Sequence, residues 1–334
     1  MRPWPEPLAR RPRKTHRPAR PRTDPATFVA EVDPAVQVFH SDQYRVPLPP
    51  GHRFPMAKYR QLREALLARG LVRPEELVPA QPAPVEELLR VHSTRWVEAV
   101  LGGQLSDAEV RRLGFPWSEE LAVRSRAAVG GTCAAAERAV EDGVGANLAG
   151  GTHHAFADHG EGYCVFNDIA VSIRSLQARG RIERALVIDL DVHQGNGTAA
   201  IFAEDPRVYT MSLHGEHNFP FRKQHSTLDV GLPDGTGDEV YLDVLVRHLP
   251  HVIAAARPDL VYYQAGVDPL ASDTLGRLGL SHDGLHARDA FVFEGVRRAG
   301  LPLVLTLGGG YARPLEASVE AHIGTYRALR ETFE

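Results

Sequence analysis

Cysteine, long apolar runs and strong net charge are all scarce or missing in this chain of 334 residues. The two cysteines, Cys133 and Cys164, are far apart and do not form a pair with metal-binding spacing, which fits a reducing cytosol. No apolar run reaches membrane-spanning length, and no apolar segment follows the basic N-terminal stretch as it would in a secretory signal. We therefore expect a cytoplasmic protein with no membrane partner.

The formal net charge is −4, so bulk electrostatics give no reason to expect nucleic-acid binding. Hydrophobic residues make up 43% of the chain and charged residues 24%, which is typical of a soluble globular protein with ample core. Residues 1–30 are rich in proline and arginine, and we interpret them as a solvated tail rather than a polyanion-binding arm. Residues 31–334 are then expected to form one domain.

Apolar runs and amphipathic stretches alternate along this domain. Short apolar runs bounded by polar turns predict strands, and apolar residues at helical spacing predict helices. The expected strands cover residues 35–39, 145–149, 184–188, 208–213, 260–265 and 303–307. The expected helices cover residues 56–69, two short segments within 86–101, 119–140, 167–177, 239–256, 282–298 and 314–329. This alternation predicts an α/β fold with helices on both faces of a parallel β-sheet.

The stretch D-L-D-V-H-Q-G-N-G at residues 189–197 directly follows an expected strand. Asp191 and His193 are two residues apart, so an extended backbone directs both side chains to the same side. Asp268 follows the strand expected at residues 260–265, and the carboxyl ends of parallel strands meet at one edge of a sheet. Two carboxylates and one imidazole leave a fourth position open, which is typical of a catalytic zinc site.

Two further segments carry reactive side chains just beyond expected strands. His153 and His154 follow the strand at residues 145–149, and beside a metal they would supply a general base and its electrostatic partner. Tyr311 follows three glycines after the strand at residues 303–307, where its hydroxyl could donate to a developing oxyanion. Either feature alone has an ordinary structural explanation, but their shared position beyond strand ends favours an active site.

Together these segments resemble the zinc-dependent histone deacetylase family, which has the three-layer αβα fold of the arginase/deacetylase type. The matching motifs, in the family's order, are G-G-T-H-H-A, G-Y-C-V-F-N-D, D-L-D-V-H-Q-G-N-G, Y-Q-A-G-V-D-P and G-G-G-Y. The resemblance covers the chain from about Val36 onward and is strongest to class IV-like and bacterial members. It implies that residues 31–334 form a single deacetylase-like catalytic domain.

The resemblance also implies a role for each matching residue. Asp191, His193 and Asp268 would bind one zinc ion per chain. His154 would act as general base and then general acid. Two more catalytic roles, those of an electrostatic neighbour and of an oxyanion donor, would fall to His153 and Tyr311.

The resemblance places Asp189 behind His153 and Asn196 behind His154. Some family members have an aspartate where Asn196 stands. Because an amide cannot raise a histidine pKa as a carboxylate can, we expect His154 to stay neutral down to lower pH here. The family's structural monovalent cation, which we expect to be K⁺, would be bound partly through backbone carbonyls. The residues that would bind it are Asp189, Asp191, His193, Ser212 and Leu213.

The family's acyl-lysine tunnel would be walled here by Gly162, Tyr163 and Phe219, with Phe221 as a second candidate for the last position. The loop before Glu119 offers no match to the family's substrate-backbone-binding aspartate. The resemblance thus implies a zinc-dependent hydrolase that removes acetyl or other acyl groups from N-acylated amines, most simply from acyl-lysine side chains of proteins.

Three other functions remain to be compared with this one. A hydrolase of acetylpolyamines or other small N-acyl amines would share every catalytic residue. A manganese ureohydrolase needs two metal ions and additional carboxylate ligands. Here Asn196 is an amide and Asp268 is a single carboxylate, so these positions supply too few ligands. A non-catalytic acyl-binding scaffold would be expected to have lost a metal ligand or the tyrosine, and none is lost here.

Overall fold

The computed structural model describes residues 36–334, so the tail expected at residues 1–30 lies outside the described part. Eight strands form one sheet in the order β2-β1-β3-β8-β7-β4-β5-β6, and every neighbouring pair is parallel. The strands are β1 Gln37–His40, β2 Leu77–Pro79, β3 Val144–Asn147, β4 Ala185–Asp189, β5 Val208–Gly215, β6 Leu228–Leu232, β7 Leu260–Gln264 and β8 Leu303–Thr306. The predicted α/β fold with a parallel sheet is confirmed.

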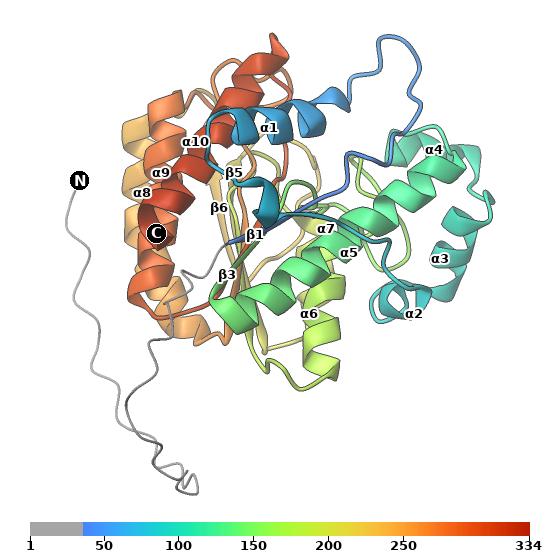
Figure 1. Cartoon of the computed structure of the whole chain (residues 1–334), viewed down its shortest axis with the longest axis horizontal. Coiled ribbons are helices and arrows are strands. Elements are labelled where there is room, and N and C mark those ends of the chain that lie inside the picture. The colour runs from blue at the N-terminus through green and yellow to red at the C-terminus, as the bar shows by residue number, and fades with distance from the viewer. Residues whose placement is uncertain (1–35) are drawn as a thin grey trace, which may run out of the picture.

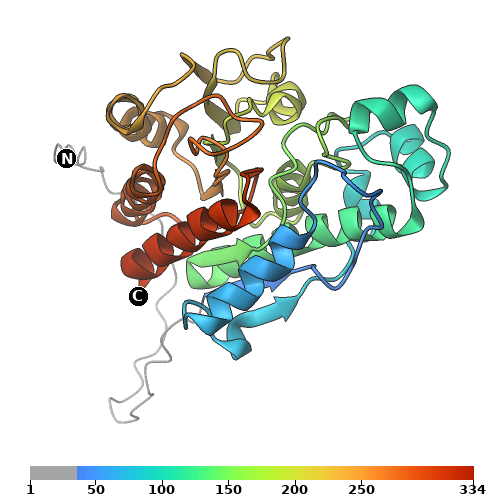
Figure 2. The same ribbon diagram turned by 90° about the horizontal axis from the view of Figure 1, so that it is seen from above.

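Helices cover both faces of this sheet (Figure 1). One face carries α1 Ala57–Ala68, α8 Asp238–Ala256, α9 His282–Arg298 and α10 Leu315–Phe333, and the other carries α5 Glu119–Asp142 and α6 Asp168–Ala178. Three short helices, α2 Val85–Leu88, α3 Thr94–Leu101 and α4 Asp107–Leu113, form a separate group beside α5, drawn in teal in Figure 2. No helix among residues 36–334 has both the length and the apolar character needed to cross a membrane.

The central strand β4 shows why its sequence is an unbroken apolar run. Leu186 and Ile188 pack into the core beneath α8, α9 and α10, whereas Val187 packs into the core beneath α5 and α6. A parallel strand covered on both faces needs apolar side chains at every position. The run ends where the chain leaves the sheet at Asp189, and the polar residues of the site begin there.

Several elements were not predicted from the sequence. Strands β2 and β6 lie at the two edges of the sheet and contain Pro79 and Gly231, which are poor strand formers. Helix α4 begins with a capping box in which Ser106 and Glu109 satisfy each other's backbone N–H groups, a signal that the sequence does carry. Helix α7, Asn196–Phe202, begins inside the G-N-G segment.

Candidate active site

The structure brings Asp191, His193 and Asp268 together beyond the carboxyl ends of β4 and β7. One ligand atom from each residue lies within 4.8 Å of the others, and all three side chains are buried. Nδ1 of His193 is 2.9 Å from Oδ1 of Asp191 and 3.1 Å from Oδ2 of Asp268. This is the only cluster of three or more such side chains found among residues 36–334.

Backbone groups hold the two carboxylates of this cluster. The N–H of Val192 donates to Oδ1 of Asp268 at 2.8 Å, and the N–H of Gly309 donates to Oδ2 of Asp191 at 2.8 Å. A Cβ atom on residue 309 would lie only 1.9 Å from Oδ2 of Asp268, so the carboxylates approach the backbone where only glycine fits. The Gly-rich segment after β8 therefore forms one wall of the cluster.

The charges of the cluster favour a cation between the carboxylates. Burial and the neighbouring charge of Asp191 raise the pKa of Asp268 to about 7. Burial opposes a charged His193, but its hydrogen bonds to Asp191 and Asp268 raise its pKa to about 10. Two buried carboxylates thus compete for one positive group, and a divalent metal bound by oxygen and nitrogen donors would relieve that competition.

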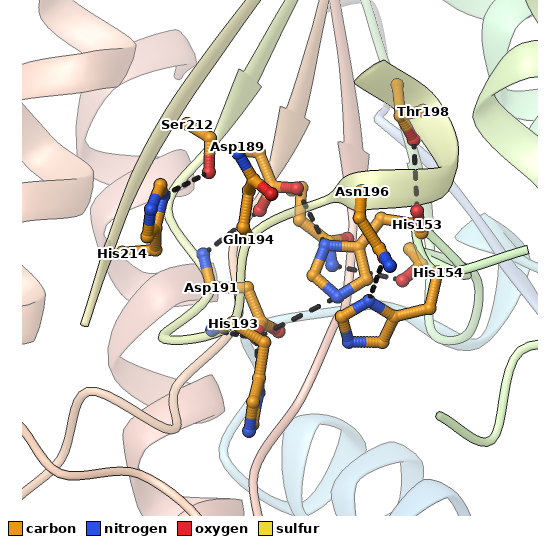
Figure 3. Close-up of polar contacts among 12 residues, drawn as sticks. His153, His154, Asp189, Asp191, His193, Gln194, Asn196, Thr198, Ser212 and His214 are labelled. Atoms are coloured by element: carbon orange, nitrogen blue, oxygen red, sulfur yellow. Dashed lines mark hydrogen bonds and ion pairs between the residues drawn. The ribbon is translucent and has the colours of Figure 1, made fainter. Parts of the chain in front are cut away.

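His153 and His154 lie beside the cluster, in the loop that follows β3 (Figure 3). Nδ1 of His153 is 2.6 Å from Oδ2 of Asp189, and Nδ1 of His154 is 2.7 Å from Oδ1 of Asn196. The structure therefore pairs each histidine with the partner that the resemblance implied. The ring centroid of His154 lies 5.9 Å from that of His193.

The two neighbouring histidines have opposite electrostatic environments. Burial disfavours a charged His153, but the carboxylates of Asp189 and Asp191 outweigh it and raise its pKa to about 9. Burial and the positive charges of His153 and His193 hold the pKa of His154 well below its ordinary value. A charged His153 thus keeps its neighbour neutral, which is the state a general base requires.

Tyr311 lies at the end of the Gly-rich segment after β8. Its N–H donates to Oδ2 of Asp273 at 2.6 Å, and its carbonyl accepts from the Thr274 hydroxyl at 2.7 Å. Burial raises the pKa of the Tyr311 hydroxyl well above its ordinary value, so the hydroxyl keeps its proton. The side chain therefore presents a neutral donor to the cavity that it lines.

A cavity of about 660 Å³ joins these groups. It is lined by both histidines, the Asp/His/Asp cluster, Tyr311, and the predicted tunnel residues Gly162, Tyr163 and Phe219. The Phe219 ring lies 4.9 Å from that of His154, whereas Phe221 is 84% exposed and lies farther out. Phe219 is thus the candidate that faces the histidines.

Four exposed arginines, Arg53, Arg111, Arg112 and Arg277, line the same cavity. The carbonyl of Arg112 accepts from the N–H of Gly162 at 3.4 Å, so this arginine lies beside the tunnel wall. The only described carboxylates that line the cavity belong to the Asp/His/Asp cluster. Arg277 is paired with Asp234 at 3.4 Å, and the other three arginines give the opening of the cavity a positive charge.

The residues proposed for a monovalent cation also lie close together. Ser212 on β5 is the register partner of Asp189 on β4, and Leu213 follows it. The Ser212 hydroxyl is 2.9 Å from Nδ1 of His214 (Figure 3). Their binding of a cation stays a prediction.

Two residues near the site were not predicted from the sequence. Lys58 is 1% exposed, and its Nζ donates to the carbonyls of Gly308 and Gly310 at 3.3 and 3.4 Å. Its spacing of four from Leu62 placed it on the buried face of the expected helix, which was an available signal. Glu161, next to the tunnel wall, accepts from Nδ2 of Asn196 at 2.5 Å, and nothing in the sequence pointed to this long-range contact.

Comparison with known proteins identifies similar chains. Residues 52–326 match the family model described as the histone deacetylase domain. Histone deacetylase 2 of Arabidopsis thaliana is 34% identical over 80% of this chain and 73% of its own length. A histone deacetylase-like amidohydrolase of Pseudomonas aeruginosa is 34% identical over 80% of this chain and 74% of its own. The crystal structure of a histone deacetylase homologue from Aquifex aeolicus superimposes with a TM-score of 0.77 at 27% identity, covering 89% of this chain and 84% of that one.

Proposed function

The chain belongs to the histone deacetylase domain family, and we propose that it is a zinc-dependent hydrolase that removes acyl groups from lysine side chains of proteins. One observation carries the proposal. A neutral histidine, His154, lies beside the Asp191, His193 and Asp268 cluster in a cavity that Tyr311 also lines. These are the groups that metal-assisted amide hydrolysis requires.

Asp191, His193 and Asp268 would hold one zinc ion through two carboxylates and one imidazole. A zinc ion bound there supplies a Lewis acid that polarises the acyl carbonyl and makes a water molecule more acidic. The donor set suits zinc, because three protein ligands leave a position open for the reactants. A single cluster of this kind in the described chain supports one catalytic metal rather than the pair of a ureohydrolase.

The side chains around the cluster would move the protons. His154, held neutral by burial and by the charges of His153 and His193, accepts a proton from the attacking water and later gives it to the leaving amine. The Tyr311 hydroxyl donates a hydrogen bond to the carbonyl oxygen as it becomes an oxyanion. Asp189 stabilises the charged form of His153. A K⁺ ion bound near Asp189 and Ser212 would hold these two residues in place.

The positive opening favours acyl-lysine of proteins over acetylpolyamines. A polyamine carries ammonium groups along its chain, and these would meet Arg53, Arg111 and Arg112, for which no salt bridge is found among the described residues. Arg277 adds less repulsion, because Asp234 lies 3.4 Å from its guanidinium. An acyl-lysine is neutral, and the polypeptide around it can be neutral or acidic. The Tyr163 and Phe219 walls suit the apolar stem of such a side chain.

The experiment that tests this function compares substrates on purified zinc-loaded protein. Acyl-lysine peptides of graded acyl length and with acidic, neutral or basic flanking residues are assayed beside acetylated polyamines. We expect kcat/KM to be highest for peptides, to fall as the flanks become basic, and to lose this dependence at high salt. Preferential turnover of acetylpolyamines would replace the proposal with the small-amine alternative, and no turnover of any amide would refute it.

A further inference from the structure

Glu161 and His154 are bonded to opposite ends of the same amide. Nδ2 of Asn196 donates to Oε1 of Glu161 at 2.5 Å, and Oδ1 of Asn196 lies 2.7 Å from Nδ1 of His154. Asn196 is 2% exposed and His154 is 4% exposed, so these contacts lie away from bulk water. The three side chains form a relay that runs from the partly exposed Glu161 to the proposed general base.

The chemistry of the three groups fixes the direction of every hydrogen bond. A carboxylate only accepts, so the NH₂ end of Asn196 must face Glu161 and its carbonyl oxygen must face His154. An amide oxygen also only accepts, and Nδ1 of His154 must therefore carry the proton. A neutral imidazole has a single N–H, which leaves the lone pair on Nε2.

We propose that Glu161 is a positioning residue that sets the tautomer of His154 through Asn196, so that Nε2 is free to accept a proton. The inference deepens the proposed function, because a general base needs its lone pair on the atom that can reach water. An aspartate in place of Asn196 would act on the histidine directly. Here the carboxylate acts one residue further away and leaves the uncharged amide next to the base.

The backbone around Glu161 holds the relay in place. The N–H of Cys164 donates to the carbonyl of Glu161 at 2.9 Å, which closes a tight turn. Gly162 follows with a φ of 56°, and a Cβ atom there would be 2.7 Å from Cδ2 of His154. The turn that presents Glu161 is therefore packed directly against the imidazole, and a shift of Glu161 is resisted on both sides.

The tautomer is measured by ¹⁵N NMR of histidine-labelled protein, with and without zinc, using His154→Ala to assign the resonances. In the wild type we expect a protonated Nδ1 and an unprotonated Nε2. Glu161→Gln can offer its own NH₂ to Asn196, which lets the amide reverse and places a proton on Nε2. We expect mixed tautomers and a fall in kcat of roughly tenfold or more, with KM little changed.

The exchanged pair Glu161→Gln with Asn196→Asp supplies the decisive variant. Its glutamine donates to the new carboxylate, which accepts from Nδ1 of His154 and restores the original tautomer. In this double variant we expect the original tautomer and most of the kcat to return. The single variant Asn196→Asp, in contrast, places its carboxylate next to that of Glu161. Glu204→Gln, at an exposed glutamate, is the matched control.

An unchanged His154 tautomer in folded Glu161→Gln protein would overturn the inference, and so would a double variant that stays as impaired as the single one. Thermal unfolding of each variant shows whether the chain is folded. Because the NMR signal needs no turnover, these outcomes stay separate from a failure of the proposed function, which would appear as an inactive wild type.

Discussion

Nζ of Lys58 lies 5.6 Å from the centroid of the Tyr311 ring and donates to the carbonyls of Gly308 and Gly310. One buried cation thus supports both the loop and the aromatic ring of the proposed oxyanion donor. Burial lowers the pKa of Lys58 to about 8, against the attraction of Asp268 and Asp191. Burial of the Lys58 ammonium is unfavourable, and its contacts indicate that it positions Tyr311 and the glycine-rich loop.

Replacing Lys58 by methionine should impair turnover more than stability. The variant keeps the length of the side chain and removes the two hydrogen bonds that hold the Tyr311 loop. Because a small displacement of a catalytic group strongly reduces the catalytic rate, we expect kcat to fall by roughly 10- to 100-fold. The melting temperature should change little, since burying an ammonium is itself unfavourable. Arg60→Met, on the exposed face of α1, is the control, and a wild-type kcat in Lys58→Met would contradict the role.

Removing a ligand of the proposed zinc ion should abolish metal binding and activity together. Asp268→Ala and His193→Ala each leave two protein donors, which is too few for a stable catalytic site. Elemental analysis after dialysis should find about one zinc per wild-type chain and almost none in either variant. Asp243→Ala, at a half-buried position of α8 remote from the cluster, should retain its zinc. Two equivalents of manganese in the wild type, or full activity in chelator, would contradict a single zinc site.

The two adjacent histidines should differ in how much turnover depends on them. His154→Ala removes the group that both takes and gives a proton, so kcat should fall by about 10²–10⁴-fold or more. His153→Ala removes a charged neighbour, and the loss should be smaller. Zinc content should survive either substitution, because neither side chain belongs to the Asp/His/Asp cluster. Near-normal turnover of His154→Ala would show that another group is the base.

The pH dependence of stability can be tested at a buried histidine remote from the cluster. His92 is 3% exposed, its Nδ1 lies 3.0 Å from the carbonyl of Phe156, and its Nε2 accepts from the N–H of Asn167. Burial lowers the pKa of His92 to about 4 from an ordinary 6.5. Between these values the unfolded chain binds a proton that the folded chain does not, so stability falls as the pH drops.

The loss in the free energy of unfolding that is due to His92 should approach about 3 kcal/mol at pH 4. Urea unfolding between pH 4 and 7 should therefore show a shallower pH dependence in His92→Gln than in the wild type. His251→Gln, at an exposed position of α8, should keep the wild-type dependence. Parallel curves for His92→Gln and the wild type would show that folding does not lower the pKa of His92.

The sequence predicted the interior of the fold better than its edges and its long-range contacts. The buried strands carry unbroken apolar runs because both of their faces are covered, and such runs are legible without a structure. Edge strands β2 and β6 need only one partner and tolerate Pro79 and Gly231. Strand ends with polar residues indicated where the site would form, since parallel strands share a carboxyl edge.

The contacts of Glu161 and Lys58 could not be read in the same way. Glu161 reaches Asn196 across 35 residues, and Lys58 reaches Gly308 across 250. Such pairs depend on how loops pass over the sheet, which local periodicity does not encode. An ionisable side chain on an apolar helix face is a partial signal, and Lys58 shows that it can mark a residue beside a functional loop.

Tyr311 provides the sharpest test of the proposed chemistry, because one atom can be removed without disturbing the ring. Tyr311→Phe keeps the contacts of the ring with Phe54 and Tyr163 and deletes only the hydroxyl. That hydroxyl should matter most when the carbonyl oxygen becomes an oxyanion, so we expect kcat to fall by about 10²–10³-fold with KM nearly unchanged. Steady-state kinetics on an acyl-lysine peptide separates the two parameters. Normal kcat with a much higher KM would instead make Tyr311 a wall of the cavity, and its position after Gly308, Gly309 and Gly310 would then serve packing rather than catalysis.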